Sequence, residues 1–205
     1  MKLVVGLGNP GRAYARSRHN IGFRVTSRFA ADLGIALDRE DFRGVCGRGR
    51  LVCGQTSDPL DVVILQPLTF MNLSGDGVAE AVASLPIDDP SHDLLVVSDD
   101  VDLPFGQLRL RSGGGPGGQK GLTHIIERLG RRDFPRLRFG IGRPRAGTET
   151  RDYVLEGFSR DEEALLPARV TRASEALTLA LCEGIPSAMN TFNRDMDEGE
   201  EPQKP

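Results

Sequence analysis

Two periods of hydrophobic positions run along the chain, one typical of strands and one typical of helices. Short apolar or alternating runs predict strands over residues 2–7, 43–53, 60–66, 93–98, 106–111 and 137–141. Three- and four-residue spacings predict helices over residues 20–34, 72–85, 119–129 and 160–183. Strands that alternate with helices predict an α/β fold: a three-layer sandwich in which helices flank a mixed, mostly parallel central sheet.

No linker or internal repeat interrupts this pattern, so we expect a single domain over residues 1–193. Residues 194–205 carry five acids and two bases and predict a disordered acidic tail. No apolar run approaches the ~20 residues that cross a bilayer, and the N-terminus does not resemble a secretory signal. These features favour a cytoplasmic protein with no membrane partner.

The three cysteines, Cys46, Cys53 and Cys182, include no Cys-x-x-Cys pair. An odd number with this spacing argues against a disulfide framework and against a zinc site. We therefore expect Cys46 and Cys53, which lie in a segment of strand character, to be small buried thiols.

Charge is unevenly distributed along the chain. The formal net charge is −3, and the acidic tail accounts for all of it, so the rest of the chain is close to neutral. Within that neutral part, residues 105–145 carry ten Lys or Arg and only two acids. Such a basic region is either a solvated face or the binding surface for a phosphate-bearing partner.

Residues 6–11 follow a strand and match the G-x-G-x-x-G pattern of dinucleotide-binding loops. That motif needs a helix that opens directly at the loop, whereas here Pro10 and a polar run up to Asn20 delay the helix. It also needs an acid at the end of a second strand, and the nearest candidate, Asp32, lies in the helix before that strand. The loop therefore favours a positioned polar group, the Asn9 amide, over a nicotinamide cofactor.

His19 is the strongest candidate base among the three histidines. It lies at the end of the loop that carries Asn9, whereas we expect His92 in an exposed turn and His124 on an ordinary helix face. A histidine base at neutral pH needs a partner that fixes its tautomer. Asp99 follows the strand at 93–98 and can reach the same edge of the sheet.

Two further features allow more than one interpretation. Asp99 and Asp102 could bind magnesium, although nothing else in the sequence completes an oxygen cage convincingly.

Phe70, Met71 and Asn72 follow another strand. Phe70 and Met71 are either core residues or exposed groups that pack on a base or an apolar side chain, and Asn72 by itself would be read as a helix N-cap.

The motifs in order resemble the bacterial-type peptidyl-tRNA hydrolase family over residues 2–193. The matching motifs are residues 6–11, Tyr14, residues 18–22, residues 70–75, residues 99–104, residues 113–121 and residues 136–142. The resemblance implies hydrolysis of the ester that joins a peptide to the 3′-terminal ribose of tRNA, which recycles tRNA from stalled translation. It implies no cofactor and no metal, and we expect a monomer with no obligatory protein partner.

The resemblance also implies roles for individual residues. His19 would activate water, Asp99 would hold His19 in its basic form, and Asn9 would help to recognise the peptide-like amine. Tyr14, Phe70, Asn72 and Gly117 would contact the tRNA 3′ end or the peptide, and Met71 would line the cleft. The partner implied by the resemblance is peptidyl-tRNA, contacted at its acceptor arm and 3′ end.

The basic region fits the same resemblance. Arg111 and Arg138 would clamp the tRNA 5′ phosphate, and Arg109 would add charge on the same strand face. The helix at 160–183 would act as a lid, unless it only packs on the sheet.

One position departs from the family pattern. After the glycine-rich loop the family commonly has His-Asn, and this chain has Gln119-Lys120. Lys120 cannot accept a hydrogen bond but can pair with a phosphate. The departure leaves room for a second hypothesis, a relative that binds RNA or serves in splicing without catalysis. A third, a nucleotide-cofactor oxidoreductase, depends only on the glycine loop.

Overall fold

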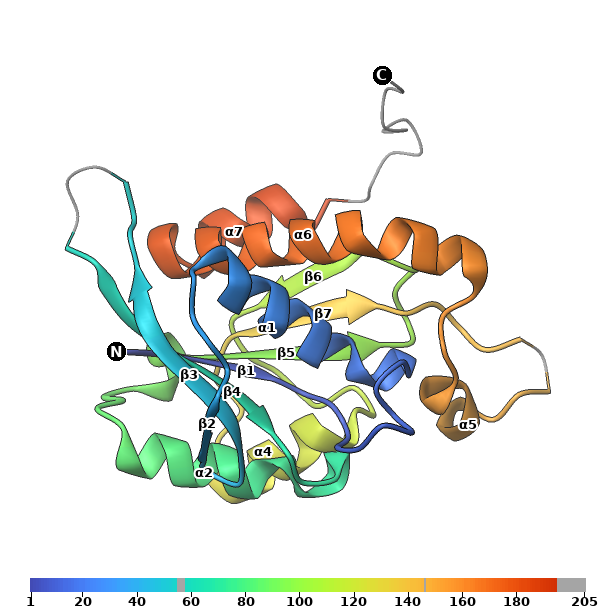
Figure 1. Cartoon of the computed structure of the whole chain (residues 1–205), viewed down its shortest axis with the longest axis horizontal. Helices are drawn as coiled ribbons and strands as arrows, with labels where there is room; N and C mark the ends of the chain where they lie inside the picture. The colour runs from blue at the N-terminus through green and yellow to red at the C-terminus, as the bar shows by residue number, and fades with distance from the viewer. Residues whose placement is uncertain (55–57, 146, 195–205) are drawn as a thin grey trace.

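The computed structural model describes residues 1–54, 58–145 and 147–194. The predicted acidic tail, apart from Arg194, lies outside the described residues. The described part contains a seven-stranded sheet in the order β2-β3-β4-β1-β5-β7-β6 (Figure 1). Its strands are β1 (Lys2–Gly6), β2 (Arg39–Asp41), β3 (Gly44–Leu51), β4 (Leu60–Pro67), β5 (Leu94–Asp100), β6 (Leu108–Arg111) and β7 (Arg136–Gly140).

The mixed sheet expected from the sequence is confirmed. The four central strands β4, β1, β5 and β7 are parallel to one another, and the antiparallel pairings involve β2, β3 and β6 toward the two edges. β1, β4 and β5 contain continuous apolar runs because helices cover both of their faces, whereas β7 alternates arginines with apolar residues. Their carboxyl ends meet at one edge, which is where such sheets form sites.

Helices cover both faces of the sheet and complete the three layers (Figure 1). The helical segments are η1 (Arg18–Asn20), α1 (Ile21–Asp32), η2 (Met71–Leu73), α2 (Ser74–Ser84), α3 (Pro90–Asp93), α4 (Lys120–Leu129), α5 (Thr150–Leu155), α6 (Arg160–Glu183) and α7 (Ile185–Phe192). One core joins α1, α6 and α7 to their face of the sheet. A second core joins α2 and α4 to the opposite face.

A close approach of α1 to β1 explains two glycines of the first motif. A side chain at Gly6 would meet the backbone of Gly22, and one at Gly22 would meet the backbones of Leu7 and Val97. Gly6 therefore serves helix packing against the strand, and no helix begins directly at the loop that follows it. This arrangement places η1, and His19 within it, beside the carboxyl ends of β1 and β5.

The expectation for the cysteines is wrong in one part. Cys53, just after β3, forms a disulfide with Cys182 near the end of α6, across 129 residues of sequence. Spacing in the sequence could not reveal this pair, because the two cysteines meet only when α6 packs on the sheet. Cys46 is a buried free thiol as expected, and burial raises its pKa.

Among the described residues, no helix is long and apolar enough to span a membrane.

Candidate active site

A pocket of about 610 Å³ opens at the carboxyl edge of the central strands. Ten of the twelve residues proposed from the sequence line it: Asn9, Tyr14, His19, Phe70, Met71, Asn72, Asp99, Gly117, Lys120 and Arg138. The other two, Arg109 and Arg111, lie outside the lining. The topology explains this gathering, since the loops after β1 and β4, the end of β5 and the glycine-rich loop all reach the same edge.

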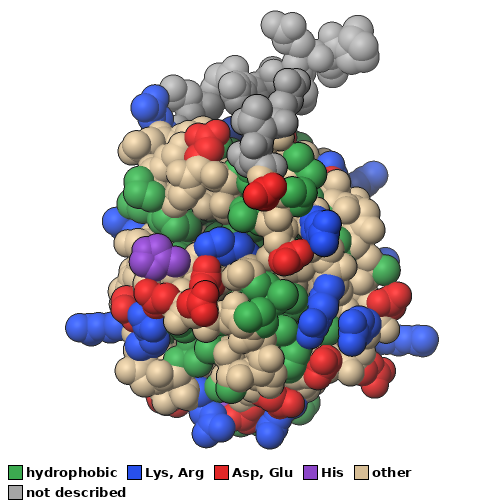
Figure 2. Space-filling model, turned by 90° about the vertical axis from the view of Figure 1, so that its left-hand side faces the viewer, with side chains coloured by type: hydrophobic (Ala, Val, Ile, Leu, Met, Phe, Trp, Pro, Cys, Tyr) green, Lys and Arg blue, Asp and Glu red, His purple; other side chains and the backbone are tan. Residues whose placement is uncertain are grey.

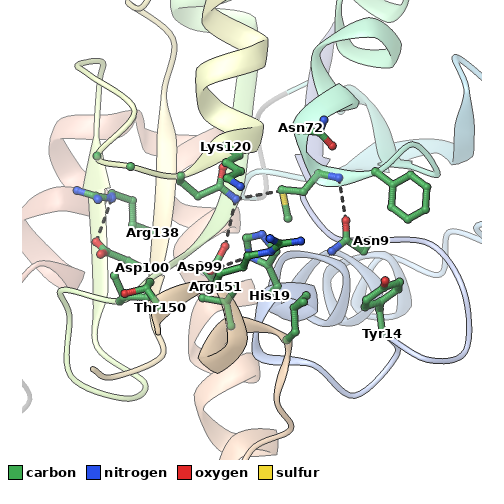
Figure 3. A pocket seen from close by; sticks show the side chains of 18 residues that line it. Asn9, Tyr14, His19, Asn72, Asp99, Asp100, Lys120, Arg138, Thr150 and Arg151 are labelled. Carbon is green, nitrogen blue, oxygen red and sulfur yellow. Dashed lines mark hydrogen bonds and ion pairs between the residues drawn. The ribbon is translucent and has the colours of Figure 1, made fainter. Parts of the chain in front are cut away.

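His19 and Asp99 are in direct contact in this pocket. Nδ1 of His19 lies 2.9 Å from Oδ2 of Asp99, and Asp99 is buried while His19 keeps a small exposed surface. Figure 3 shows the two side chains pointing toward each other. With an ionised carboxylate at Nδ1, the neutral imidazole carries its hydrogen there and leaves the Nε2 lone pair free to accept a proton.

The Asn9 amide is held in one orientation. Its Oδ1 accepts a hydrogen bond from the backbone N–H of Met71 at 2.8 Å. Its own backbone is held by Asn20, whose side chain accepts from Asn9 N–H at 2.8 Å and donates to Asn9 carbonyl at 2.9 Å. Because Oδ1 is occupied, the Nδ2 hydrogens are the groups that Asn9 can offer to a ligand.

Gln119 is a buried member of the site that sequence analysis did not assign to it. Its Nε2 donates to Oδ1 of Asp99 at 3.1 Å and contacts the sulfur of Met71 at 3.1 Å. Its Oε1 accepts the backbone N–H of Leu122 at 2.7 Å, which caps α4. The only signal in the sequence was the departure at residues 119–120.

The residues that follow β4 divide between core and surface. Met71 is buried, and Phe70 and Asn72 are exposed at the mouth of the pocket. Phe70 is 54% exposed, which suits stacking on a flat ligand group better than core packing. Asn72 does not cap a helix with its side chain, so its amide is not used in that way.

The four arginines of β6 and β7 share one face of the sheet. In the register of the two strands, Arg109 lies opposite Arg138 and Arg111 lies opposite Arg136. The leucines between them face the α6 core. Arg138 lies in the pocket, where Nε is 3.0 Å from Oδ2 of Asp100 and the guanidinium lies against Gly117. Arg111 is exposed and two residues further from the site edge.

Arg136, by contrast, is 2% exposed and is not available to a ligand. Its guanidinium donates to the carbonyls of Gly115, Arg132 and Phe134, and it stacks on the Phe134 ring. Burial, with a contribution from the charge of Arg138, lowers the pKa of Arg136 to about 10. Arg136 thus holds the glycine-rich loop in place.

Of the two interpretations of the helix at 160–183, the structure favours packing on the sheet over a lid. α6 has the predicted bounds, but it packs on the face of the sheet opposite to the arginines, and none of its residues lines the pocket. The pocket wall on this side comes instead from α5, through Thr150, Arg151, Val154 and Leu155. Arg151 shares the pocket with His19 and Asp99 (Figure 3). A six-residue helix is too short to show a clear period in the sequence.

Arg18, next to His19, ties the site to the segments around α5 and α6. Its guanidinium forms a two-pronged ion pair with Glu162 at 2.6 and 2.8 Å and stacks on the rings of Tyr153 and Phe158. Burial alone would lower the pKa of Arg18, but Glu162 raises it above its ordinary value. Burial likewise opposes ionisation of Glu162, yet Arg18 and Ser159 lower its pKa.

The other histidines lie where expected. His92 has a side chain that is 79% exposed. His124 lies on α4 and its Nδ1 accepts the backbone N–H of Gly75 at 3.0 Å. Within the described residues, no cluster of three or more His, Cys, Asp or Glu side chains could hold a metal ion, so the magnesium interpretation has no support there.

Comparison with known proteins identifies a family for the chain. The sequence profile of the family described as Peptidyl-tRNA hydrolase matches residues 3–201. A peptidyl-tRNA hydrolase of Syntrophotalea carbinolica is 44% identical over 193 residues, covering 94% of this chain and 97% of that protein. One of Symbiobacterium thermophilum is 45% identical over 192 residues, covering 94% of this chain and 98% of that protein.

Solved structures lead to the same family. The crystal structure of peptidyl-tRNA hydrolase from Acinetobacter baumannii superimposes with a TM-score of 0.83 at 36% identity, covering 94% of each chain. The profile match, the relatives and the shared fold each extend over nearly the whole chain. This chain therefore belongs to the peptidyl-tRNA hydrolase family.

Proposed function

We propose that this protein hydrolyses the ester bond between peptide and tRNA in peptidyl-tRNA, with His19 as the base that activates water. Family membership supports the reaction and its substrate. The observation that supports His19 as the base is its 2.9 Å contact with Asp99 inside the pocket. An RNA-binding relative without catalysis would have no need of this buried pair.

The mechanism uses Nε2 of His19 to take a proton from water as the oxygen attacks the ester carbonyl. Asp99 stabilises the imidazolium that forms, and the tetrahedral intermediate collapses with loss of the ribose oxygen. The imidazolium returns its proton to that oxygen, so the products are a free peptide carboxyl group and a tRNA 3′ end with its hydroxyl restored. No cofactor takes part in this scheme.

Asn9 contributes a fixed donor to this reaction. Its Nδ2 is the free end of an amide whose oxygen is held by Met71. A peptide carbonyl near the ester can accept this hydrogen bond, whereas an unblocked aminoacyl group has no such carbonyl and presents a charged amine. Asn9 is therefore proposed to favour the peptidyl substrate.

The tRNA end is proposed to enter between the glycine-rich loop and α5. Lys120 and Arg138 would pair with phosphates, and Gly117 would allow the backbone to approach closely. Tyr14, Phe70 and Asn72 would contact the 3′-terminal nucleotide or the peptide. Arg109 and Arg111 would extend the cationic surface beyond the pocket, along β6.

We further propose that residues 1–193 form the catalytic domain and that the protein works in the cytoplasm as a monomer, in recovery of tRNA from stalled ribosomes. Size-exclusion chromatography with light scattering would test the monomer. A mass of twice the 22.2 kDa chain would contradict it.

The decisive experiment incubates purified protein with N-acetyl-aminoacyl-tRNA and follows release of free tRNA. We expect cleavage by the wild type and a loss of at least about 100-fold in kcat for His19→Ala, because general-base catalysis contributes on that order. His92→Ala is the matched control, since that histidine is exposed and outside the pocket, and it should cleave at the wild-type rate.

Two results would reject the proposal. Binding of the substrate without cleavage by the wild type would favour the RNA-binding relative. Cleavage by His19→Ala at the wild-type rate would remove His19 from the reaction.

A further inference from the structure

We propose that Gln119 is a positioning residue that holds Asp99 in the orientation His19 needs. The inference rests on the proposed function, in which His19 is the base and Asp99 its partner. Residues 119 and 120 are the two positions at which the chain departs from the family pattern. Of the two, the buried Gln119 and not the exposed Lys120 acts on the catalytic pair.

Gln119 is built into the site. Its side chain is buried, with the residue 8% exposed, and all three of its polar contacts are to the protein interior. Nε2 faces two acceptors, the Asp99 carboxylate and the Met71 sulfur, and Oε1 faces a donor, the Leu122 N–H. The reverse orientation would place an amide oxygen against a carboxylate, so the surroundings permit only one.

Asp99 receives a donor on each of its carboxylate oxygens. His19 bonds Oδ2 at 2.9 Å and Gln119 bonds Oδ1 at 3.1 Å. Two donors on different oxygens fix the rotation of the carboxylate plane, whereas one donor leaves that plane free to turn. The direction in which His19 presents Nε2 to water therefore depends on Gln119 as well as on Asp99.

The contacts of Gln119 also link the base to Asn9. Met71, whose sulfur lies 3.1 Å from Nε2 of Gln119, gives its backbone N–H to Asn9. Asn9 is bonded in turn to Asn20, the chain neighbour of His19. The contacts close a ring, hereafter the site ring: His19, Asp99, Gln119, Met71, Asn9 and Asn20. Gln119 is the member that joins the catalytic pair to the amide pair.

Gln119 has a second, purely structural task as the N-cap of α4. The two tasks use different atoms, since Oε1 caps the helix and Nε2 serves Asp99. Substitutions can therefore separate them. Gln119→Glu keeps the length and the capping oxygen but removes the donor to Asp99. Gln119→Met keeps the length and packing but removes both functions.

The experiment measures kcat and KM on N-acetyl-aminoacyl-tRNA for both variants at mildly alkaline pH, where the Glu side chain is ionised. We expect kcat to fall by about tenfold or more in each variant, the size of a lost hydrogen bond to a charged group, with KM changed less than about twofold. Thr123→Val is the control, because it removes another first-turn hydrogen bond of α4 without a contact to Asp99. It should keep wild-type kcat.

A second measurement needs no substrate. Proton NMR of the free protein should show the His19 Nδ1–H resonance of the wild type broadened or lost in both variants, because the fixed carboxylate protects that hydrogen from exchange. The ring-proton resonances of His124, which lies on α4, report whether that helix remains folded.

The outcomes separate the two proposals. If the wild type does not cleave the substrate, the proposed function fails. If the wild type cleaves but Gln119→Glu keeps wild-type kcat and an unchanged His19 resonance, Gln119 is only a helix cap and this inference fails. Equal losses of kcat and of the His124 signal in both variants would likewise assign Gln119 to α4 stability alone.

Discussion

At the scale of single residues, the orientation of each side-chain amide decides whether it offers a hydrogen-bond donor or an acceptor to its surroundings. Asn9 presents donors because its oxygen is taken by a backbone N–H. Gln119 also lines the pocket, but both polar atoms of its side chain are already bonded to Asp99, Met71 and Leu122. Asn9 and Gln119 therefore supply fixed hydrogen bonds to the site through side chains that carry no net charge and do not titrate.

Arg138 carries a prediction about tRNA affinity. Its contact with Asp100 uses Nε, and the rest of its guanidinium lies at the pocket beside Gly117. We expect Arg138→Gln to weaken tRNA binding and to reduce the slope of log affinity against log salt by about one, because one phosphate contact is lost.

Binding titrations at several salt concentrations would measure this slope. Arg50→Gln is the matched control, since Arg50 is 74% exposed on β3 and outside the pocket. An unchanged affinity in Arg138→Gln would remove Arg138 from the binding surface. Arg111→Gln tests in the same way whether the cationic surface extends along β6.

How far the site could be predicted depends on what places each residue. Asn9 and His19 lie in the segment after β1 and Asp99 lies at the carboxyl end of β5, so the rule that parallel strands end at one edge was enough to bring them together. Gln119 reaches Asp99 only because the glycine-rich loop folds back over the end of β5, and a loop path has no period in the sequence. For the same reason the sequence drew attention to Lys120, which is exposed, and away from its buried neighbour.

At the scale of elements, the long segments were predictable and the short ones were not. α6 was expected with the bounds it has, and the other long helices and strands lie within a few residues of their predicted positions. β2, α3 and α5 have between three and six residues, and α7 has eight, too few for a hydrophobic period to stand out. The wall of the pocket formed by α5 was missed for this reason.

The junction of η1 with α6 carries a prediction about stability and pH. Glu162 has a lowered pKa in the folded protein, so it stabilises the fold above its unfolded pKa and loses this contribution as pH falls through the folded pKa. Glu162→Gln should therefore lower the free energy of unfolding at neutral pH by roughly 1–3 kcal/mol.

Urea unfolding of the two proteins at a series of pH values tests this. The difference between wild type and Glu162→Gln should shrink as pH falls below about 4.5, the ordinary value for a glutamate. A difference that stays constant over that range would show that the ion pair with Arg18 contributes no pH-dependent stability.

At the scale of the whole molecule, the arginines and the disulfide belong to different parts of the strand order, with the arginines on β6 and β7 at one side and the disulfide following β3 toward the other. Figure 2 shows the face at the left of Figure 1, away from α5, where basic and acidic side chains are interspersed. The arginines of β6 and β7 instead share one face, and Arg138 lies at the pocket. The disulfide joins the segment after β3 to α6 and so ties a sheet edge to one helical layer.

The disulfide should stabilise the fold without affecting catalysis. A cross-link that closes a loop of 129 residues is expected to contribute about 2–4 kcal/mol. Reductant should lower the free energy of unfolding by that amount in the wild type and in Cys46→Ser, and should have no effect on Cys53→Ser. No cysteine lines the pocket, so kcat should be the same in both redox states. Insensitivity of the wild type to reductant would show that the pair is not bonded in solution, as a reducing cytoplasm would favour.

Because the site ring is closed, the geometry of each member depends on its neighbours in both directions. Opening a ring at any one contact releases the geometry of its neighbours, so the first substitution removes part of what the second would have removed. The losses of catalytic activity on replacing Asn9, Gln119 and Asn20 are then coupled. The loss caused by replacing two of them together is smaller than the sum of the two separate losses. No fixed share of catalysis belongs to any one of these three side chains, because each acts through the arrangement that the others maintain.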